Sequence, residues 1–227
     1  YSAFTLFKHA LSGHRRWPQS WRSPELKSRY DVVVIGGGGH GLATAYHLAK
    51  DHGIRNVAVL EKGWLGGGNT GRNTAVSRSN YFYPESTLFY EHSLKRYEGL
   101  SRELNFNIMF SQIGLINLAF DRHDMEIFRR WVTSIQLQGV DCKVMSREEV
   151  AAAIPRLNMG KNARYPVYGG FMQGRAGISR HDAVAWAFAR AADKLGVDII
   201  QNCEVTGLEV SDGRIRGVRT SRGSIRA

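Results

Sequence analysis

The sequence contains few cysteines and no long apolar run. Cys142 and Cys203 are the only cysteines among 227 residues, and without a CxxC pair they exclude a disulfide framework and favour a reducing compartment. No segment approaches the roughly 18 to 20 apolar residues that a membrane-spanning helix needs. The N-terminus also lacks the continuous apolar stretch of a secretory signal. These absences predict a cytoplasmic protein without a membrane span.

Positive charge is concentrated near the N-terminus of a chain whose net charge is +11. Against one acid, Glu25, residues 1–30 carry these basic side chains: Lys8, Arg15, Arg16, Arg22, Lys27 and Arg29. Such an extension suits an acidic partner or an anionic surface. It has no basic face interleaved with stacking aromatics, so we expect no nucleic-acid binding. A basic arm packed on a partner subunit is the favoured interpretation.

A dinucleotide-binding pattern follows this extension. The apolar run Val32–Ile35 leads into a GxGxxG motif at Gly36–Gly41, a helical pattern and a second apolar run, Val57–Leu60. The glycines permit a tight turn that brings the backbone close to a pyrophosphate at the helix N-terminus. Glu61, about 20 residues beyond the motif, is placed to accept hydrogen bonds from a ribose. The pattern predicts a Rossmann-like βαβ unit and leaves NAD and FAD both open.

The rest of the chain predicts further α/β structure. A glycine- and asparagine-rich loop at 63–74 is too long for a plain turn and is a candidate functional loop. We expect a helix over 84–104 with Leu88, His92, Leu94 and Leu100 near one face. Other helices are expected at 123–137, 146–154 and 181–195, an extended or looped segment at 160–180, and strands at 113–120 and 197–200. Strands at 204–210, 214–220 and 223–227 predict a β-meander.

Several separated blocks resemble one family. YDVVVIGGGGHGLATAYHLAKDHGIRNVAVLEKGWLGGGNTGRNT, the following RSNY, FSQIGLINLA and HDAVAWAFARAADKLGVDIIQNCEVTG resemble the β subunits of heterotetrameric sarcosine oxidases. The N-terminal YSAFTLFKHAL resembles them as well, so the likeness covers nearly the whole chain. It implies an α/β (α+β overall) architecture: a Rossmann-like FAD-binding domain with a β-meander, and part of a substrate domain with an antiparallel or mixed sheet.

The resemblance implies a domain division and a set of FAD ligands. The expected division is a basic extension at 1–30, a discontinuous FAD-binding domain at 31–85 and 176–227, and part of a substrate or interface domain at 86–175. The chain start at Tyr1 and its end at Ala227 are expected to be cut ends of an N-terminal fragment. The residues expected to bind non-covalent FAD are Gly36, Gly38, Gly39, His40, Gly41, Glu61, Lys62, Asn69, Arg72, Asn73, Thr74 and Val205.

Two further residues gain roles from the resemblance. His181 matches the histidine that carries covalent FMN in the family, and a capping-box-like start, Ser179-x-x-Asp182, places it in the first turn of a helix. The positive end of that helix favours a neutral, nucleophilic imidazole. Arg78 matches the arginine expected to pair with the substrate carboxylate. Ala75 and Ser77 depart from the β-branched run expected before that arginine.

The implied function is oxidative demethylation of sarcosine as a β subunit, with α, γ and δ subunits as partners. The products would be glycine, hydrogen peroxide and formaldehyde or 5,10-methylenetetrahydrofolate, and electrons would pass from FAD to covalent FMN. Alternatives are a stand-alone FAD-dependent D-amino-acid or glycine oxidase or dehydrogenase, a non-catalytic flavin-binding assembly module, and an NAD-dependent dehydrogenase. The histidine spacings predict no metal site.

Overall fold

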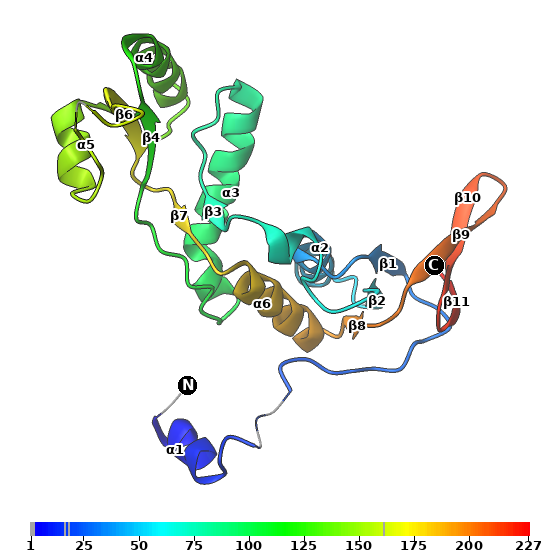
Figure 1. Ribbon diagram of the computed structural model, residues 1–227. Coiled ribbons are helices and arrows are strands. Elements are labelled where there is room, and N and C mark those ends of the chain that lie inside the picture. Colours follow the sequence, from blue (N-terminus) through cyan, green and yellow to red (C-terminus); the bar gives the residue numbers. More distant parts are fainter. Residues whose placement is uncertain (1–2, 16, 18, 161) are drawn as a thin grey trace. The chain divides into compact units, whose positions relative to one another are not determined.

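The computed structural model describes residues 3–15, 17, 19–160 and 162–227. The chain forms two compact units, one from Tyr1–Arg72 with Val184–Ala227 and the other from Asn73–Ala183 (Figure 1). The first unit is therefore discontinuous, and the second is inserted into it. These boundaries lie at 72/73 and 183/184, whereas the sequence predicts them near 85 and 176.

The first unit contains the expected parallel sheet. Strands β1 (Val32–Ile35), β2 (Val57–Leu60) and β8 (Asp198–Ile200) pair in the order β1-β2-β8. All four residues of β2 are buried, as expected for the central strand of a covered parallel sheet. Helix α2 (Gly39–Asp51) packs on β1 and β2 and buries Leu42, Ala45, Tyr46 and Ala49. This is the βαβ unit that the sequence predicts.

A β-meander completes the first unit. Strands β9 (Val205–Ser211), β10 (Arg214–Thr220) and β11 (Gly223–Arg226) are antiparallel and form a separate three-stranded sheet. Asp212 and Gly213 join the first two with φ angles of 52° and 70°, which match a two-residue hairpin turn. Val218 and Ile225 pack in one buried cluster with Leu60 of β2, so the meander shares a core with the parallel sheet.

Part of the N-terminal extension packs within the first unit. A short helix, α1 (Ala3–Leu11), begins it and has no buried residue. Further along, Arg22 Nε lies 2.8 Å from Asp193 Oδ1 and Lys27 Nζ lies 2.6 Å from Asp198 Oδ2. The buried Tyr30 donates its hydroxyl to Asp198 at 3.2 Å. These contacts tie residues 22–30 to the start of β8 and the end of helix α6 (His181–Lys194).

The second unit is built on an antiparallel sheet. Strands β4 (Leu115–Ala119), β6 (Gly169–Gln173) and β5 (Cys142–Met145) pair in the order β4-β6-β5. Helices α4 (Arg122–Gln136) and α5 (Arg147–Ala153) pack on this sheet (Figure 1). Its central strand β6 lies in the segment 160–180, which was expected to be extended or looped. The edge strand β5 was not predicted.

Four further elements lie in the second unit or at its boundaries in the sequence. Helix α3 spans Pro84–Glu103. Strand β3 (Val76–Ser77) pairs antiparallel with β7 (Gly177–Ile178). Helix α6 begins with three residues in this unit and continues into the first. The short 3-10 helix η1 (Asn69–Arg72) closes the first stretch of the other unit.

Candidate functional site

The glycine turn after β1 brings backbone atoms closer together than a side chain would allow. Gly36 has φ +105°, and its N–H donates to the Leu60 carbonyl at 2.8 Å. A Cβ atom at Gly41 would lie 2.0 Å from the Gly36 carbonyl oxygen. The first turn of α2 can therefore approach β1 only because residue 41 is glycine. This is the close packing that a dinucleotide turn requires.

The N-terminus of α2 has the features of an anion site. Gly38 occupies the N-cap with an extended backbone and no side-chain cap, and the first turn carries no acid. The Gly39 N–H donates to Thr70 Oγ1 at 2.9 Å. The other N–H groups of the first turn and the positive end of the helix dipole favour a phosphate at this position. Thr70, which brings η1 to the turn, was not predicted.

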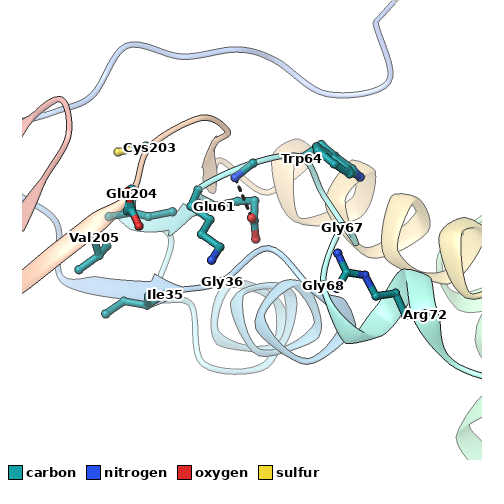
Figure 2. A pocket seen from close by; sticks show the side chains of 13 residues that line it. Ile35, Gly36, Glu61, Trp64, Gly67, Gly68, Arg72, Cys203, Glu204 and Val205 are labelled. Atoms are coloured by element: carbon teal, nitrogen blue, oxygen red, sulfur yellow. Dashed lines mark hydrogen bonds between the residues drawn. The ribbon is translucent and has the colours of Figure 1, made fainter.

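Glu61 holds the turn together through both of its carboxylate oxygens. Oε2 accepts from the Gly37 N–H at 2.8 Å, and Oε1 accepts from the Gly63 N–H at 2.9 Å, the bond dashed in Figure 2. Each carboxylate oxygen has a second lone-pair direction. The carboxylate is thus fixed in orientation by backbone donors and retains acceptor capacity for a ribose hydroxyl.

A cavity of about 570 Å³ opens beside this carboxylate. Figure 2 shows Ile35 and Val205 at one end and Arg72, at the end of η1, at the other. Its charged lining consists of Glu61, Lys62, Arg72 and Glu204. The volume is in the range of pockets that hold small molecules and cofactors.

Five of the residues expected to bind FAD line this cavity: Gly36, Glu61, Lys62, Arg72 and Val205. Others belong to the turn or the loop without being part of the lining: Gly38, Gly39, His40, Gly41 and Asn69. The lining also includes four residues of the predicted functional loop that were not named individually: Gly63, Trp64, Gly67 and Gly68. Four lining residues outside that loop were not predicted: Ile35, Leu60, Cys203 and Glu204. Trp64 is 70% exposed beside the cavity.

The glycine-rich loop is fastened to the turn and to β8. The Gly66 N–H donates to the Gly37 carbonyl at 3.0 Å, and the Leu65 N–H donates to Gln201 Oε1 at 3.0 Å. Leu65 itself is buried. These bonds and the buried Leu65 side chain give this part of the loop a defined conformation next to the cavity.

The other predicted residues lie in the second unit. Asn73 accepts a bond from the Ala75 N–H at 2.6 Å, and Ala75 has φ +60°, in the left-handed region. Asn73 and Thr74 are exposed. Arg78 directly follows β3, where its Nη1 donates to Asn80 Oδ1 at 2.8 Å and its guanidinium lies 4.2 Å from the centre of the Tyr81 ring. Burial raises the pKa of Tyr81, and the Arg78 charge opposes this shift.

His181 is the first residue of α6, as predicted. Among the residues that the structure describes, no group accepts from or donates to its buried Nδ1 atom. The Asp182 carboxylate accepts from Arg180 at 2.6 Å and from the Ala183 N–H at 2.8 Å. These bonds lower the pKa of Asp182, the Arg180 bond contributing most. The first turn of α6 therefore holds an imidazole nitrogen that still lacks a partner.

Two negative observations apply to the described ranges. No group of three or more His, Cys, Asp or Glu side chains there could hold a metal ion. No helix in those ranges is both long enough and apolar enough to cross a membrane.

Comparison with known proteins places these features in a family context. The profile of the family described as FAD dependent oxidoreductase matches residues 31–227. The chain is 52% identical over 225 residues to sarcosine oxidase subunit beta of Rhodobacter capsulatus, covering 99% of this chain and 54% of the relative. It is 55% identical over 207 residues to the same subunit of an Arthrobacter species, covering 91% and 51%. The chain thus spans about half the length of these relatives.

A solved structure shares the fold. The L-proline dehydrogenase of P. horikoshii matches with a TM-score of 0.81 and 27% identity, covering 88% of this chain and 51% of the other. Dimethylglycine dehydrogenase of Rattus norvegicus is 33% identical over 206 residues, which is 90% of this chain and 23% of that protein.

Proposed function

Because the chain belongs to the FAD-dependent oxidoreductase family, we propose that it functions as the β subunit of a sarcosine oxidase. The glycine turn, the oriented Glu61 carboxylate and the cavity beside them fit the adenosine and diphosphate parts of FAD. The identity of more than half over nearly the whole chain to two such β subunits supports this choice among the family's activities. The observation that most directly supports a flavin site is that the Glu61 carboxylate accepts hydrogen bonds from both the Gly37 and the Gly63 N–H groups.

The residues of the cavity, the glycine turn and the adjoining loop each have a proposed role in binding FAD. Glu61 accepts from the adenosine ribose, and the Gly36–Gly41 turn with the α2 N-terminus binds the pyrophosphate. Lys62 lies near the ribose, and the Val205 backbone meets the adenine. Towards the flavin, the proposed contacts are Asn69, Arg72, Asn73 and Thr74. Bound FAD would supply the two-electron acceptor for oxidation of the sarcosine N-methyl group. Water or tetrahydrofolate would take up the one-carbon unit, giving glycine with formaldehyde or 5,10-methylenetetrahydrofolate, and molecular oxygen would take up the electrons as hydrogen peroxide.

Arg78 is proposed to bind the sarcosine carboxylate. A guanidinium can form two parallel hydrogen bonds with a carboxylate, which fixes the orientation of the substrate as well as its charge. Asn80 occupies one Nη1 donor, so most of the five N–H groups remain for a ligand. Held in this way, the substrate would present its N-methyl group in one orientation.

His181 is proposed to hold FMN covalently through a ring nitrogen. Its place in the first turn of α6 and the unpartnered, buried Nδ1 atom are compatible with that bond. The positive end of the helix favours a neutral imidazole and a nearby phosphate. The proposed partners are α, γ and δ subunits, and the two free, buried cysteines suit a reducing cytoplasm.

An absorption spectrum before and after acid precipitation tests this function. We expect the full-length chain, co-expressed with its partner subunits, to carry two flavins, of which FAD is released and FMN stays with the precipitate. Acid precipitation of the His181→Asn variant should release all of its flavin, and its FAD content before precipitation should equal that of the unaltered protein. Complete release from the unaltered protein would exclude the covalent bond, and a single extractable flavin with activity in the isolated chain would favour a stand-alone oxidase.

A further inference from the structure

The segment that follows Arg78 is fixed by one buried amide side chain. Gln173, the last residue of β6, accepts the Ser79 N–H at 3.0 Å and the Asn80 N–H at 3.2 Å through the same oxygen, Oε1. Gln173, Ser79 and Asn80 are each 0% exposed. These two consecutive backbone donors lie just beyond the end of β3 and donate to this side chain instead of to a neighbouring strand.

The amide nitrogen of Gln173 secures the same segment from its other side. Nε2 donates to Ser79 Oγ at 2.6 Å and to Asp141 Oδ1 at 3.2 Å. The Ser79 hydroxyl in turn donates to Glu91 Oε2 at 2.6 Å, and Glu91 is paired with Arg175. Both donors and the acceptor of Gln173 are thus satisfied. A buried amide whose hydrogen bonds are all made restricts the residues bonded to it to one conformation. Among the described residues, the Asn80 Nδ2 atom beside it has no hydrogen-bond partner.

The orientation of the Arg78 guanidinium depends on the two residues after Ser79. Asn80 Oδ1 accepts from Arg78 Nη1 at 2.8 Å, and the Tyr81 ring lies under the guanidinium at 4.2 Å. Tyr81 itself stacks on Tyr90 of α3, with ring centres 4.0 Å apart. Both groups that orient the guanidinium therefore belong to the segment whose backbone Gln173 fixes.

We propose that Gln173 is a positioning residue that sets substrate-carboxylate recognition by holding Asn80 and Tyr81 in the places from which they orient Arg78. This inference rests on the proposed role of Arg78. Without the amide, the Ser79 and Asn80 N–H groups lose their buried acceptor, and the segment must move to find others. A displacement of about 1 Å in a group that positions the substrate can slow the reaction by up to about a hundredfold.

A double-mutant cycle in the full-length protein, assembled with its partners, tests the inference. The variants are Gln173→Leu, Arg78→Ala and the two combined, and the readouts are kcat and KM for sarcosine with FAD content measured in each sample. We expect Gln173→Leu to raise KM about tenfold to a hundredfold in the unaltered background. In the Arg78→Ala background the same change should raise KM less than about twofold, because the two residues act in series.

Two further variants separate positioning from general stability. Gln136→Leu removes another glutamine-to-backbone bond in the same unit, from Nε2 to the Cys142 carbonyl at 2.7 Å, and should leave KM unchanged. Ser79→Ala removes only the hydroxyl link and serves if Gln173→Leu does not fold. It should raise KM severalfold, and this effect too should vanish in the Arg78→Ala background.

The outcomes distinguish the inference from the function on which it rests. If Arg78→Ala leaves KM unchanged, the carboxylate role of Arg78 is wrong. If Arg78→Ala raises KM but the effect of Gln173→Leu is the same in both backgrounds, Gln173 does not act through Arg78. A lower melting temperature with unchanged KM, for either Gln173→Leu or Ser79→Ala, would also overturn the inference.

Discussion

Replacing Glu61 by glutamine tests the flavin site most directly. The carboxylate accepts from the Gly37 N–H at 2.8 Å and from the Gly63 N–H at 2.9 Å. A glutamine amide has one oxygen, so it can keep one of these bonds, and its NH2 group would face the other N–H. The substitution therefore removes a charge-assisted hydrogen bond and leaves a backbone donor unpaired at the turn.

The expected loss in FAD affinity comes from the proposed hydrogen bond between the ribose and this carboxylate, because the two backbone bonds exist without a ligand. A hydrogen bond to a charged group contributes about 1.5 to 3 kcal/mol, which corresponds to roughly a 10- to 150-fold increase in Kd. Displacement of the turn after loss of a backbone bond would move the result towards the upper end. The turn packs around glycines that leave no room to rearrange, as the 2.0 Å approach at Gly41 shows, so relaxation should recover little of the loss.

The measurement is reconstitution of the flavin-depleted full-length protein with FAD, followed by flavin fluorescence. Glu204→Gln is the matched control, because Glu204 lines the same cavity and is exposed. Removing that charge should leave the Kd for FAD within about threefold or tighten binding, since an acid near a diphosphate repels it. Equal Kd values for Glu61→Gln and the unaltered protein would refute the site described above.

Four further outcomes are expected. Gly41→Ala should abolish FAD retention, because its Cβ would lie 2.0 Å from a carbonyl oxygen; a normal flavin content would contradict this. Phe171→Ala, at a fully buried ring 4.8 Å from Phe128, should lower the free energy of unfolding by about 3 to 5 kcal/mol in urea titrations. The Arg175 hydrogen bond lowers the pKa of Glu98 below 4.5, so the folded state binds fewer protons there than the unfolded state. Stability should therefore fall as the pH drops below about 4.5, and Glu98→Gln should flatten that part of the curve. Burial raises the pKa of the Cys142 thiol to about 12, so it should resist thiol reagents at pH 8 until the protein unfolds.

The sequence predicted the parts of the fold that local patterns encode. The βαβ unit follows from apolar periodicity and glycine spacing, and the capping box of α5 follows from Ser146 and Glu149, which form both of its reciprocal bonds. Strand β6 was expected only as part of an extended or looped segment, because it starts with two glycines. A Cβ at Gly170 would lie 2.5 Å from the Asn117 carbonyl oxygen. Glycine at position 170 is therefore explained by the close approach of β4 to β6, which an apolar pattern in the sequence does not predict.

The burial of polar side chains was a second feature that could not be predicted from the sequence. Of the α3 residues expected near one face, Leu94 and Leu100 are buried, whereas Leu88 and His92 are exposed. Thr87 and Glu91 are buried instead of the latter two. Glu91 can be buried because Arg175 and Ser79 neutralise and hydrogen-bond it. Those partners are remote in sequence, so a single-chain pattern gives no sign of them. For the same reason the sequence gives no sign that Gln173 accepts the Ser79 and Asn80 N–H groups.

The pairing of β2 with β8 has a consequence for biosynthesis. Leu60 lies opposite Ile200 in that ladder, and roughly 140 residues must leave the ribosome between them before the third strand can dock. Until then the N–H and C=O groups on that edge of β2 are unpaired, while the intervening unit forms contacts of its own. Chaperone dependence and aggregation should therefore be greatest for nascent chains arrested just before the codons of β8.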